Sequence, residues 1–205
     1  MEYDLRQLAV LILLAVLFGV RISAHRQAGG LLRDQEDGIS LEGGRSIAIA
    51  LRLLFLVGGI GGIVVWLIAP QVLPGNVALP TWVHWLAIGL IVYGLVLLVS
   101  VHLALGIHFS GTLHLRSDHQ LVQSGPYKRV RHPMYTAFLM IFVGLSLLVA
   151  NVLVGMIWMG AIAWLLGWRL KPEEAQLSER FGSHWEDYVS QTGKLLPKFR
   201  TVKTD

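Results

Sequence analysis

Long stretches of apolar residues are the feature that most constrains how this chain can fold. Residues 46–69 and 82–105 are each long enough for a membrane span, which takes roughly 20 apolar residues to cross about 30 Å of hydrocarbon. The first contains one charged residue, Arg52, and the second contains none. Because lipid offers no hydrogen-bond partners to the backbone, both segments are predicted to be helices.

Three shorter apolar segments follow the same pattern, at about residues 5–23, 134–150 and 152–168. Asn151 alone separates the last two, which predicts a tight helical hairpin. Glu2 and Asp4 precede the first segment where a signal peptide would carry positive charge, so this segment is predicted to be a retained span. With 54% apolar and 15% charged residues, the chain is predicted to be an all-α integral membrane bundle of about five transmembrane helices.

Lysine and arginine fall almost entirely on one side of these predicted spans. Residues 21–45, 106–133 and 169–205 carry four, four and seven of the 17 basic residues, whereas residues 70–81 and Asn151 carry none. The positive-inside rule therefore places the N-terminus outside and the C-terminus in the cytoplasm. The same asymmetry accounts for the net charge of +4, so no nucleic-acid partner is expected.

The segments predict one membrane domain over residues 1–205. Residues 1–105 hold three N-terminal spans, and residues 106–205 form a core with the hairpin 134–168 and a C-terminal amphipathic helix. The glycine-rich stretch 24–45 is interpreted as a solvated linker.

Several kinds of chemistry are disfavoured by the residues present. The chain has no cysteine, which excludes disulfides, thiolate metal sites and cysteine nucleophiles. No metal site is expected, because the central histidines lack the i, i+4 spacing of a helical zinc site; they are His102, His108, His114, His119 and His132. No nucleophile-elbow motif is present, and spans 82–105, 134–150 and 152–168 lack the acidic residues of an intramembrane aspartyl protease.

A dense polar motif, SGPYKRVRHPMY at residues 124–135, stands between two apolar segments. Pro133 suits the first turn of a helix, which leaves the amides of Met134 and Tyr135 free for an anionic group. Tyr127 and Tyr135 can offer flat faces and hydroxyls to an aromatic ligand such as adenine. The alternative is a positively charged membrane anchor with interfacial tyrosines.

A second polar block, residues 169–197, follows the last apolar segment. Arg169 suits a carboxylate or phosphate, and Glu173, four residues later, suits an ammonium group. Pro172 between them is expected to break or kink the helix, and an ordinary ion pair is the alternative. The following residues read as an amphipathic helix that lies against the membrane or caps the site, with an apolar side made of Phe181, Trp185, Tyr188 and Val189.

The two blocks together, HQLVQSGPYKRVRHPMY and RLKPEEAQLSERFGSHWEDYVSQTGKLLP, resemble the isoprenylcysteine carboxyl methyltransferase family over residues 102–198. The resemblance implies an integral membrane enzyme that uses S-adenosylmethionine and releases S-adenosylhomocysteine. Arg169 would face the methyl acceptor. The implied cofactor-binding residues are His119, Gln120, Leu121, Val122, Tyr127, His132, Pro133, Met134, Tyr135 and Glu173.

Five predicted spans, against the eight of longer animal enzymes, make the chain similar to compact prokaryotic members, which implies a cytoplasmic membrane with the site facing the cytoplasm. Carboxyl O-methylation of an amphiphilic, isoprenylcysteine-like acceptor is the predicted reaction. A carboxylate is already anionic and needs no general base, which agrees with the lack of an obvious catalytic dyad. The alternatives are a lipid amine or small thiol as acceptor, a membrane lipid reductase, and a non-catalytic membrane protein.

Overall fold

The structure is a computed structural model that describes residues 6–8, 10–16, 19, 59–105 and 121–198. Its elements are α3 (Gly61–Ile68), η2 (Pro70–Val72), α4 (Thr81–Leu105), η4 (Gly125–Lys128), α5 (Pro133–Val149), α6 (Val152–Phe181) and α7 (Ser183–Gln191). Within these ranges the only strand-like pairings are two isolated bridges. The predicted all-α class is therefore confirmed for the described part of the chain.

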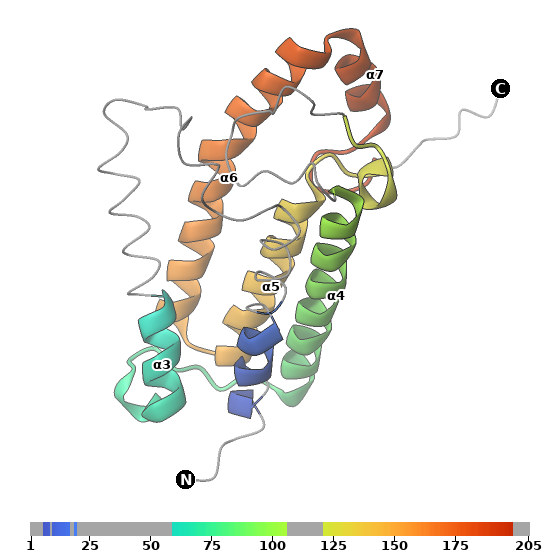
Figure 1. Cartoon of the computed structure of the whole chain (residues 1–205). Helices are drawn as coiled ribbons and strands as arrows, with labels where there is room; N and C mark the ends of the chain where they lie inside the picture. The colour runs from blue at the N-terminus through green and yellow to red at the C-terminus, as the bar shows by residue number, and fades with distance from the viewer. Residues whose placement is uncertain (1–5, 9, 17–18, 20–58, 106–120, 199–205) are drawn as a thin grey trace, which may run out of the picture.

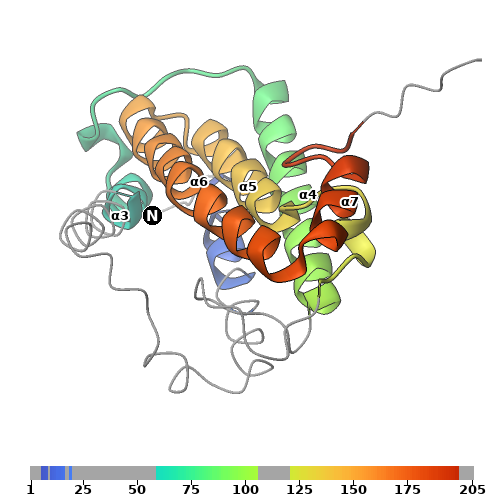
Figure 2. The same cartoon turned by 90° about the horizontal axis from the view of Figure 1, so that it is seen from above.

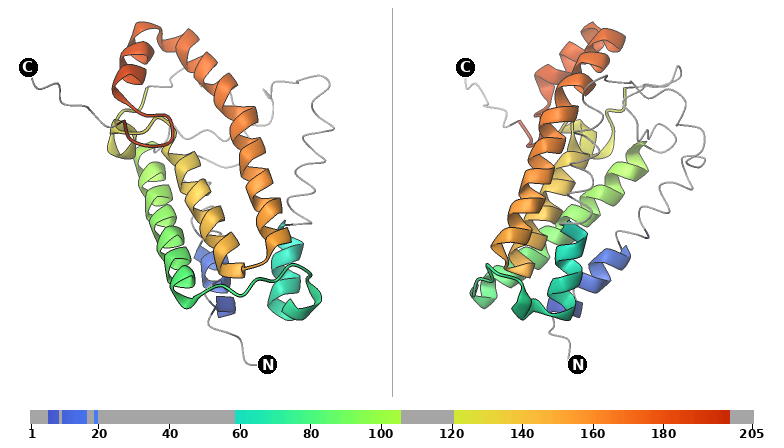
Figure 3. Two further views of the ribbon diagram at one scale, coloured as in Figure 1. Left: turned by 180° about the vertical axis from the view of Figure 1, so that it is seen from behind. Right: turned by 90° about the vertical axis from the view of Figure 1, so that its left-hand side faces the viewer.

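Three long helices form the body of the molecule. In Figure 1, α4 and α5 lie side by side, and α6 diverges from them and extends past their ends. Helix α7 then folds back toward η4, as the view from above in Figure 2 and the two views in Figure 3 also show. Helix α3 lies at the opposite end, beside the beginning of α6. Segments 121–135 and 183–198 are thus brought to one end of the bundle.

Two of the described helices, α4 and α6, are long and apolar enough to cross a membrane, judged by length and composition. Helix α5 is apolar but has only 17 residues. Part of the predicted first span and all of residues 46–58 lie outside the described residues. The count of five spans and the orientation of the termini therefore stay predictions.

The predicted hairpin is confirmed by α5 and α6, which are joined through Ala150 and Asn151. The expected break at Pro172 is wrong, because α6 continues through this residue to Phe181. A proline inside a helix removes one backbone donor, and the remaining hydrogen bonds of a 30-residue helix can carry that loss. The uninterrupted helix fixes Arg169 and Glu173 on one rigid element.

Helices α4 and α5 pack through the same residue pattern, Ala-x-x-x-Ile-x-x-Gly, which begins at Ala87 in α4 and at Ala137 in α5. A Cβ atom on Gly144 would lie 2.6 Å from Ile91 Cγ1 and 2.8 Å from the Ala87 carbonyl oxygen. A Cβ atom on Gly94 would lie 2.7 Å from Ile141 Cγ1 and 3.0 Å from the Ala137 carbonyl oxygen. The two glycines therefore allow the antiparallel helix backbones to approach closely.

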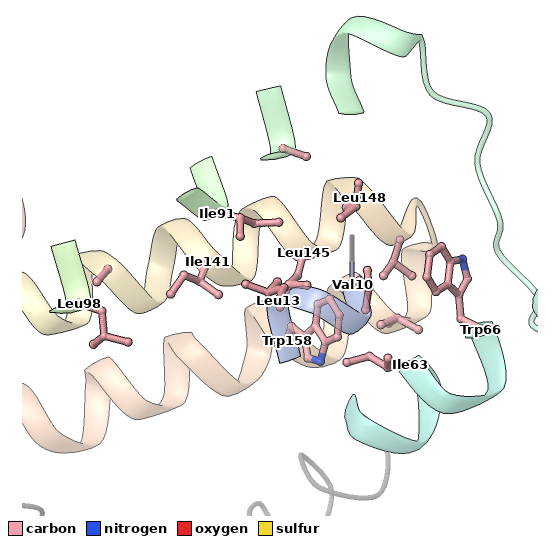
Figure 4. Packing of buried hydrophobic residues seen from close by; sticks show 14 residues of the cluster. Val10, Leu13, Ile63, Trp66, Ile91, Leu98, Ile141, Leu145, Leu148 and Trp158 are labelled. Carbon is pink, nitrogen blue, oxygen red and sulfur yellow. The ribbon is translucent and has the colours of Figure 1, made fainter. Parts of the chain in front are cut away.

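The hydrophobic core is formed by residues of the N-terminal helical segment, α3, α4, α5 and α6 (Figure 4). Ile141 and Leu145 from α5 lie against Ile91 and Leu98 from α4, and Trp158 of α6 is 1% exposed. The N-terminal helical residues and α3 complete this cluster with Val10, Leu13, Ile63 and Trp66. The hairpin is therefore packed against both the N-terminal part of the chain and α4.

Asn151 ties the turn of the hairpin to the connector between α3 and α4. Its side chain accepts a hydrogen bond from the Val154 amide (3.1 Å), capping α6, and donates to Asn76 Oδ1 (2.8 Å) and to the Pro74 carbonyl (3.1 Å). Asn76 in turn donates to the carbonyls of Pro70 and Leu73. This network gives a buried polar side chain a full set of partners and fixes the end of the bundle remote from η4.

The predicted C-terminal amphipathic helix is divided in two. Gly182, at φ +50°, ends α6, and α7 begins at the next residue. A positive φ is inexpensive for glycine, so Gly182 allows the sharp reversal that carries α7 back to η4.

Candidate functional site

Backbone hydrogen bonds join the two polar blocks of the sequence. The Arg131 amide donates to the Gly193 carbonyl (2.8 Å), the His132 amide donates to the Lys194 carbonyl (3.1 Å), and the Gly193 amide donates to the Arg129 carbonyl (3.1 Å). The Thr136 hydroxyl donates to the carbonyl of Leu195 at 2.6 Å. The segment after α7 is therefore paired with the residues that lead into α5, although about sixty positions separate them in sequence.

Arg131 has a structural role where these two segments pair, which we call the joint between the two polar blocks. Its guanidinium donates to the carbonyls of Thr192 (2.7 Å) and Val189 (3.2 Å), beside the C-terminus of α7, where a cation complements the helix dipole. Tyr188 of α7 donates from its hydroxyl to the Tyr127 carbonyl at 2.8 Å, and burial raises the pKa of Tyr188 to about 12. Trp185 and Tyr188 are each 5% exposed, so α7 turns its aromatic side toward the rest of the protein.

Glu173 is the centre of the group that the sequence singled out. The Tyr135 hydroxyl donates to Glu173 Oε2 at 2.7 Å, and His132 Nδ1 lies 3.6 Å from Glu173 Oε1. Burial, and then the charge of Glu173, raises the pKa of Tyr127 above its ordinary value, so Tyr127 lies within electrostatic reach of that carboxylate. The charge of Arg169 acts on Glu173 as well. The structure thus brings together five predicted site residues from η4, α5 and α6.

The two adjacent glutamates lie beyond Trp168, where the apolar part of α6 ends. For Glu173, burial favours the neutral acid, but hydrogen bonds and charge from His132, then Tyr135 and Arg169, outweigh it and lower the pKa. For Glu174, burial is likewise outweighed by Lys194 and His132, which lower its pKa. Both carboxylates are therefore ionised at neutral pH, and this end of the bundle presents a fixed negative charge at Glu173.

The remaining predicted residues have varied surroundings. Leu121 and Val122 are half-buried and non-helical, and they lead into η4. Pro133 is buried at the first position of α5, as predicted, and Met134 packs against the hydrophobic core. His119 and Gln120 lie outside the described residues.

Sequence reasoning missed the importance of Glu174 and Lys194. The carboxylate of Glu174 lies 2.7 Å from Lys194 Nζ, 3.1 Å from His132 Nε2 and 3.4 Å from Arg131 Nε. Both residues stand inside the sequence blocks that carry the resemblance, but their pairing depends on α6 running unbroken through Pro172. The available signal in the sequence was the adjacent pair of glutamates. Neighbouring residues of a helix point in different directions, so the second glutamate faces other side chains than the first.

The fold and the site define a helical bundle with two apolar helices of membrane-spanning length and an ionised, aromatic-lined cluster at one end. Among the described residues, no group of three or more histidine and acidic side chains is arranged to hold a metal ion. Residues 87–179 match the model of the isoprenylcysteine carboxyl methyltransferase (ICMT) family. The chain is therefore similar to this family over these residues, which include the first of the two polar blocks that carry the resemblance and the beginning of the second.

Several curated relatives carry the corresponding name. Protein-S-isoprenylcysteine O-methyltransferase B of Arabidopsis thaliana is 26% identical over 119 residues, which cover 57% of this chain and 60% of the relative. The Mus musculus protein-S-isoprenylcysteine O-methyltransferase is 27% identical over 61% of this chain and 45% of its own. The Saccharomyces cerevisiae protein is 33% identical over 40% of this chain and 34% of its own. The aligned regions span from about a third to three fifths of the length of these relatives.

A solved structure described as the eukaryotic intramembrane Ras methyltransferase ICMT has a similar fold. It superposes with a TM-score of 0.53 over 78% of this chain and 54% of its own, at 23% sequence identity. The likeness extends to the fold of the bundle.

Proposed function

We propose that this protein is an S-adenosylmethionine-dependent membrane methyltransferase that transfers a methyl group to the carboxylate of an amphiphilic, isoprenylcysteine-like acceptor. The observation that carries the proposal is the convergence of Tyr127, His132, Tyr135 and Arg169 around the ionised Glu173. This convergence lies within the two sequence blocks that carry the family resemblance. The names of the relatives supply the reaction type.

The side chains present fit the cofactor in chemical type. A half-buried carboxylate such as Glu173 attracts an ammonium or sulfonium group, and tyrosine rings offer flat faces to adenine. When bound, S-adenosylmethionine supplies a methyl group on a positively charged sulfur, which passes to the acceptor oxygen and leaves S-adenosylhomocysteine. Leu121, Val122, Pro133 and Met134 belong to the proposed binding segment, together with His119 and Gln120.

The protein would contribute alignment and exclusion of water in place of acid–base chemistry. Arg169 immediately follows the apolar part of α6, a suitable position for an arginine that receives the head group of a lipidic acceptor. With the acceptor carboxylate at Arg169 and the cofactor at Glu173, the methyl donor and the acceptor would be held at a fixed distance. This alignment is the main source of acceleration in a bimolecular displacement. A cationic amine acceptor would be repelled by Arg169, which favours the carboxylate.

The proposed setting is a membrane crossed by α4 and α6, with the polar cluster at the cytoplasmic face of a prokaryotic inner membrane. Large apolar side chains on α4 support this placement, because Trp82, Val96 and Leu103 are 66%, 61% and 71% exposed. Such a chain would receive its polar cofactor from the cytoplasm and its acceptor from the bilayer. Basic residues flanking the apolar segments favour the same orientation.

Binding of S-adenosylhomocysteine to the detergent-solubilised protein tests the proposal. Calorimetry should detect binding by wild type, its loss in Glu173→Ala and a weakened but measurable binding in His132→Ala, whereas Glu179→Ala, an exposed site on the same helix, should bind normally. Arg169→Ala should keep cofactor binding and lose methyl transfer from radiolabelled donor to an isoprenylcysteine acceptor. Unchanged binding in both cofactor-site variants would refute the assignment of the site.

A further inference from the structure

Glu174 is surrounded by three basic side chains from separate parts of the chain. Lys194 Nζ, His132 Nε2 and Arg131 Nε approach its carboxylate at 2.7, 3.1 and 3.4 Å. The Glu174 side chain is 24% exposed, and the His132 side chain is only 3% exposed. A partly buried carboxylate with this many charge-assisted contacts has a fixed position.

Glu173 and Glu174 point in different directions, because successive residues of an α-helix differ by about 100°, and apart from His132 their partners differ. Glu173 receives the Tyr135 hydroxyl and acts electrostatically on Tyr127. The contacts of Glu174 run instead to the residues that join the start of α5 to the segment after α7. Glu174 is therefore placed to act on the proposed cofactor site through another residue.

His132 is that residue, since its ring stands between the two carboxylates. Its Nε2 is 3.1 Å from Glu174 Oε1, and its Nδ1 is 3.6 Å from Glu173 Oε1. A ring flip would turn carbon atoms toward both carboxylates and lose both contacts. The stronger contact, to Glu174, therefore decides which nitrogen His132 presents to Glu173.

We propose that Glu174 is a positioning residue, which orients the His132 ring and thereby fixes Glu173 for the cofactor. The proposal rests on the proposed function, because it assigns His132 and Glu173 to cofactor binding. The competing role for Glu174 is purely structural, as an anchor for Arg131 and Lys194 in the joint between the two polar blocks. The two roles differ in how mutations at 174 and 132 combine.

A double-mutant cycle with S-adenosylhomocysteine binding distinguishes them. Glu174→Gln should weaken binding about tenfold to a hundredfold, the scale of one charge-assisted hydrogen bond. In a His132→Ala background, Glu174→Gln should cause no further loss, because the residue through which it acts is gone. Losses that simply add in the double variant would overturn the proposal.

Two further variants separate an effect on the orientation of His132 from an effect on the stability of the protein. Lys194→Ala removes a partner of Glu174 but leaves His132 in place, so it should lower the melting temperature while the affinity stays close to wild type. Glu174→Asp keeps the negative charge near Lys194 but withdraws it from His132, so it should retain stability and lose affinity. Equal affinity losses in Lys194→Ala and Glu174→Gln would establish the structural role instead.

Titration of the wild-type protein with S-adenosylhomocysteine distinguishes a failure of the proposed function from a failure of the positioning role. Absence of binding by wild type would refute the proposed function, and with it a cofactor role for Glu174. Binding by wild type combined with an unchanged affinity in Glu174→Gln would refute the positioning role alone.

Discussion

Gly144→Ala tests the close packing of α4 on α5, on which the position of the whole site depends. The added methyl group would lie 2.6 Å from Ile91 Cγ1, 2.8 Å from the Ala87 carbonyl oxygen and 3.3 Å from the Ile91 amide nitrogen. A side chain could turn away from such a contact, but the backbone atoms cannot move unless the helices separate. Overpacking of this kind costs about 1–3 kcal/mol, and two backbone neighbours place Gly144 near the upper value.

The helix propensity of alanine offsets about 1 kcal/mol of that cost. The expected net loss is therefore ~2 kcal/mol, or about 4–8 °C in melting temperature for a chain of this size. Thermal unfolding in detergent, followed by circular dichroism or intrinsic fluorescence, measures it.

Gly160→Ala is the matched control, because it is also a glycine inside an apolar helix. Apart from the surrounding backbone of its own helix, no heavy atom of the described residues lies within 4 Å of a Cβ placed there, so this variant should be as stable as wild type or up to about 1 kcal/mol more stable. Gly94→Ala, with its backbone contact at 3.0 Å, should lose less stability than Gly144→Ala. If Gly144→Ala and Gly160→Ala melted at the same temperature, the inferred close approach of the helices would be wrong.

Three further predictions concern the two ends of the bundle. Asn151→Ala should lose about 2 kcal/mol, since it removes a helix cap and two hydrogen bonds, and the same melting assay in detergent reads it. Tyr135→Phe removes the 2.7 Å bond to Glu173 and should weaken S-adenosylhomocysteine binding about fivefold, for ~1 kcal/mol; an affinity equal to wild type would exclude Tyr135 from the site. Acid should destabilise wild type more than Glu174→Gln. The Glu174 carboxyl group has a lowered pKa in the folded protein, so it contributes stability above its unfolded pKa of about 4.3 and loses that contribution as the pH falls through its folded pKa. Parallel losses of melting temperature between pH 7 and pH 3 in the two proteins would contradict that assignment.

The sequence by itself determined the helical class, the hairpin and the two polar blocks. Apolar length predicts helices because the backbone of a lipid-embedded segment has no other partners, and 82–105 is indeed helical as α4. Pro133 at the start of α5 and Asn151 at the turn were also readable, since each acts on its nearest neighbours along the chain. The pairing of Tyr127 with Glu173 came from the resemblance, because no local rule connects residues so far apart.

Only the tertiary structure decided which partners each polar residue contacts. The continuation of α6 through Pro172 sets Glu173 toward the tyrosines and Glu174 toward Lys194, although the two glutamates are chemically identical in the sequence. Arg131, one of the basic residues of the first polar block, donates its hydrogen bonds at the end of α7. These assignments depend on contacts between residues tens of positions apart, and the direction of a side chain across such a distance is set by helix packing rather than by local sequence.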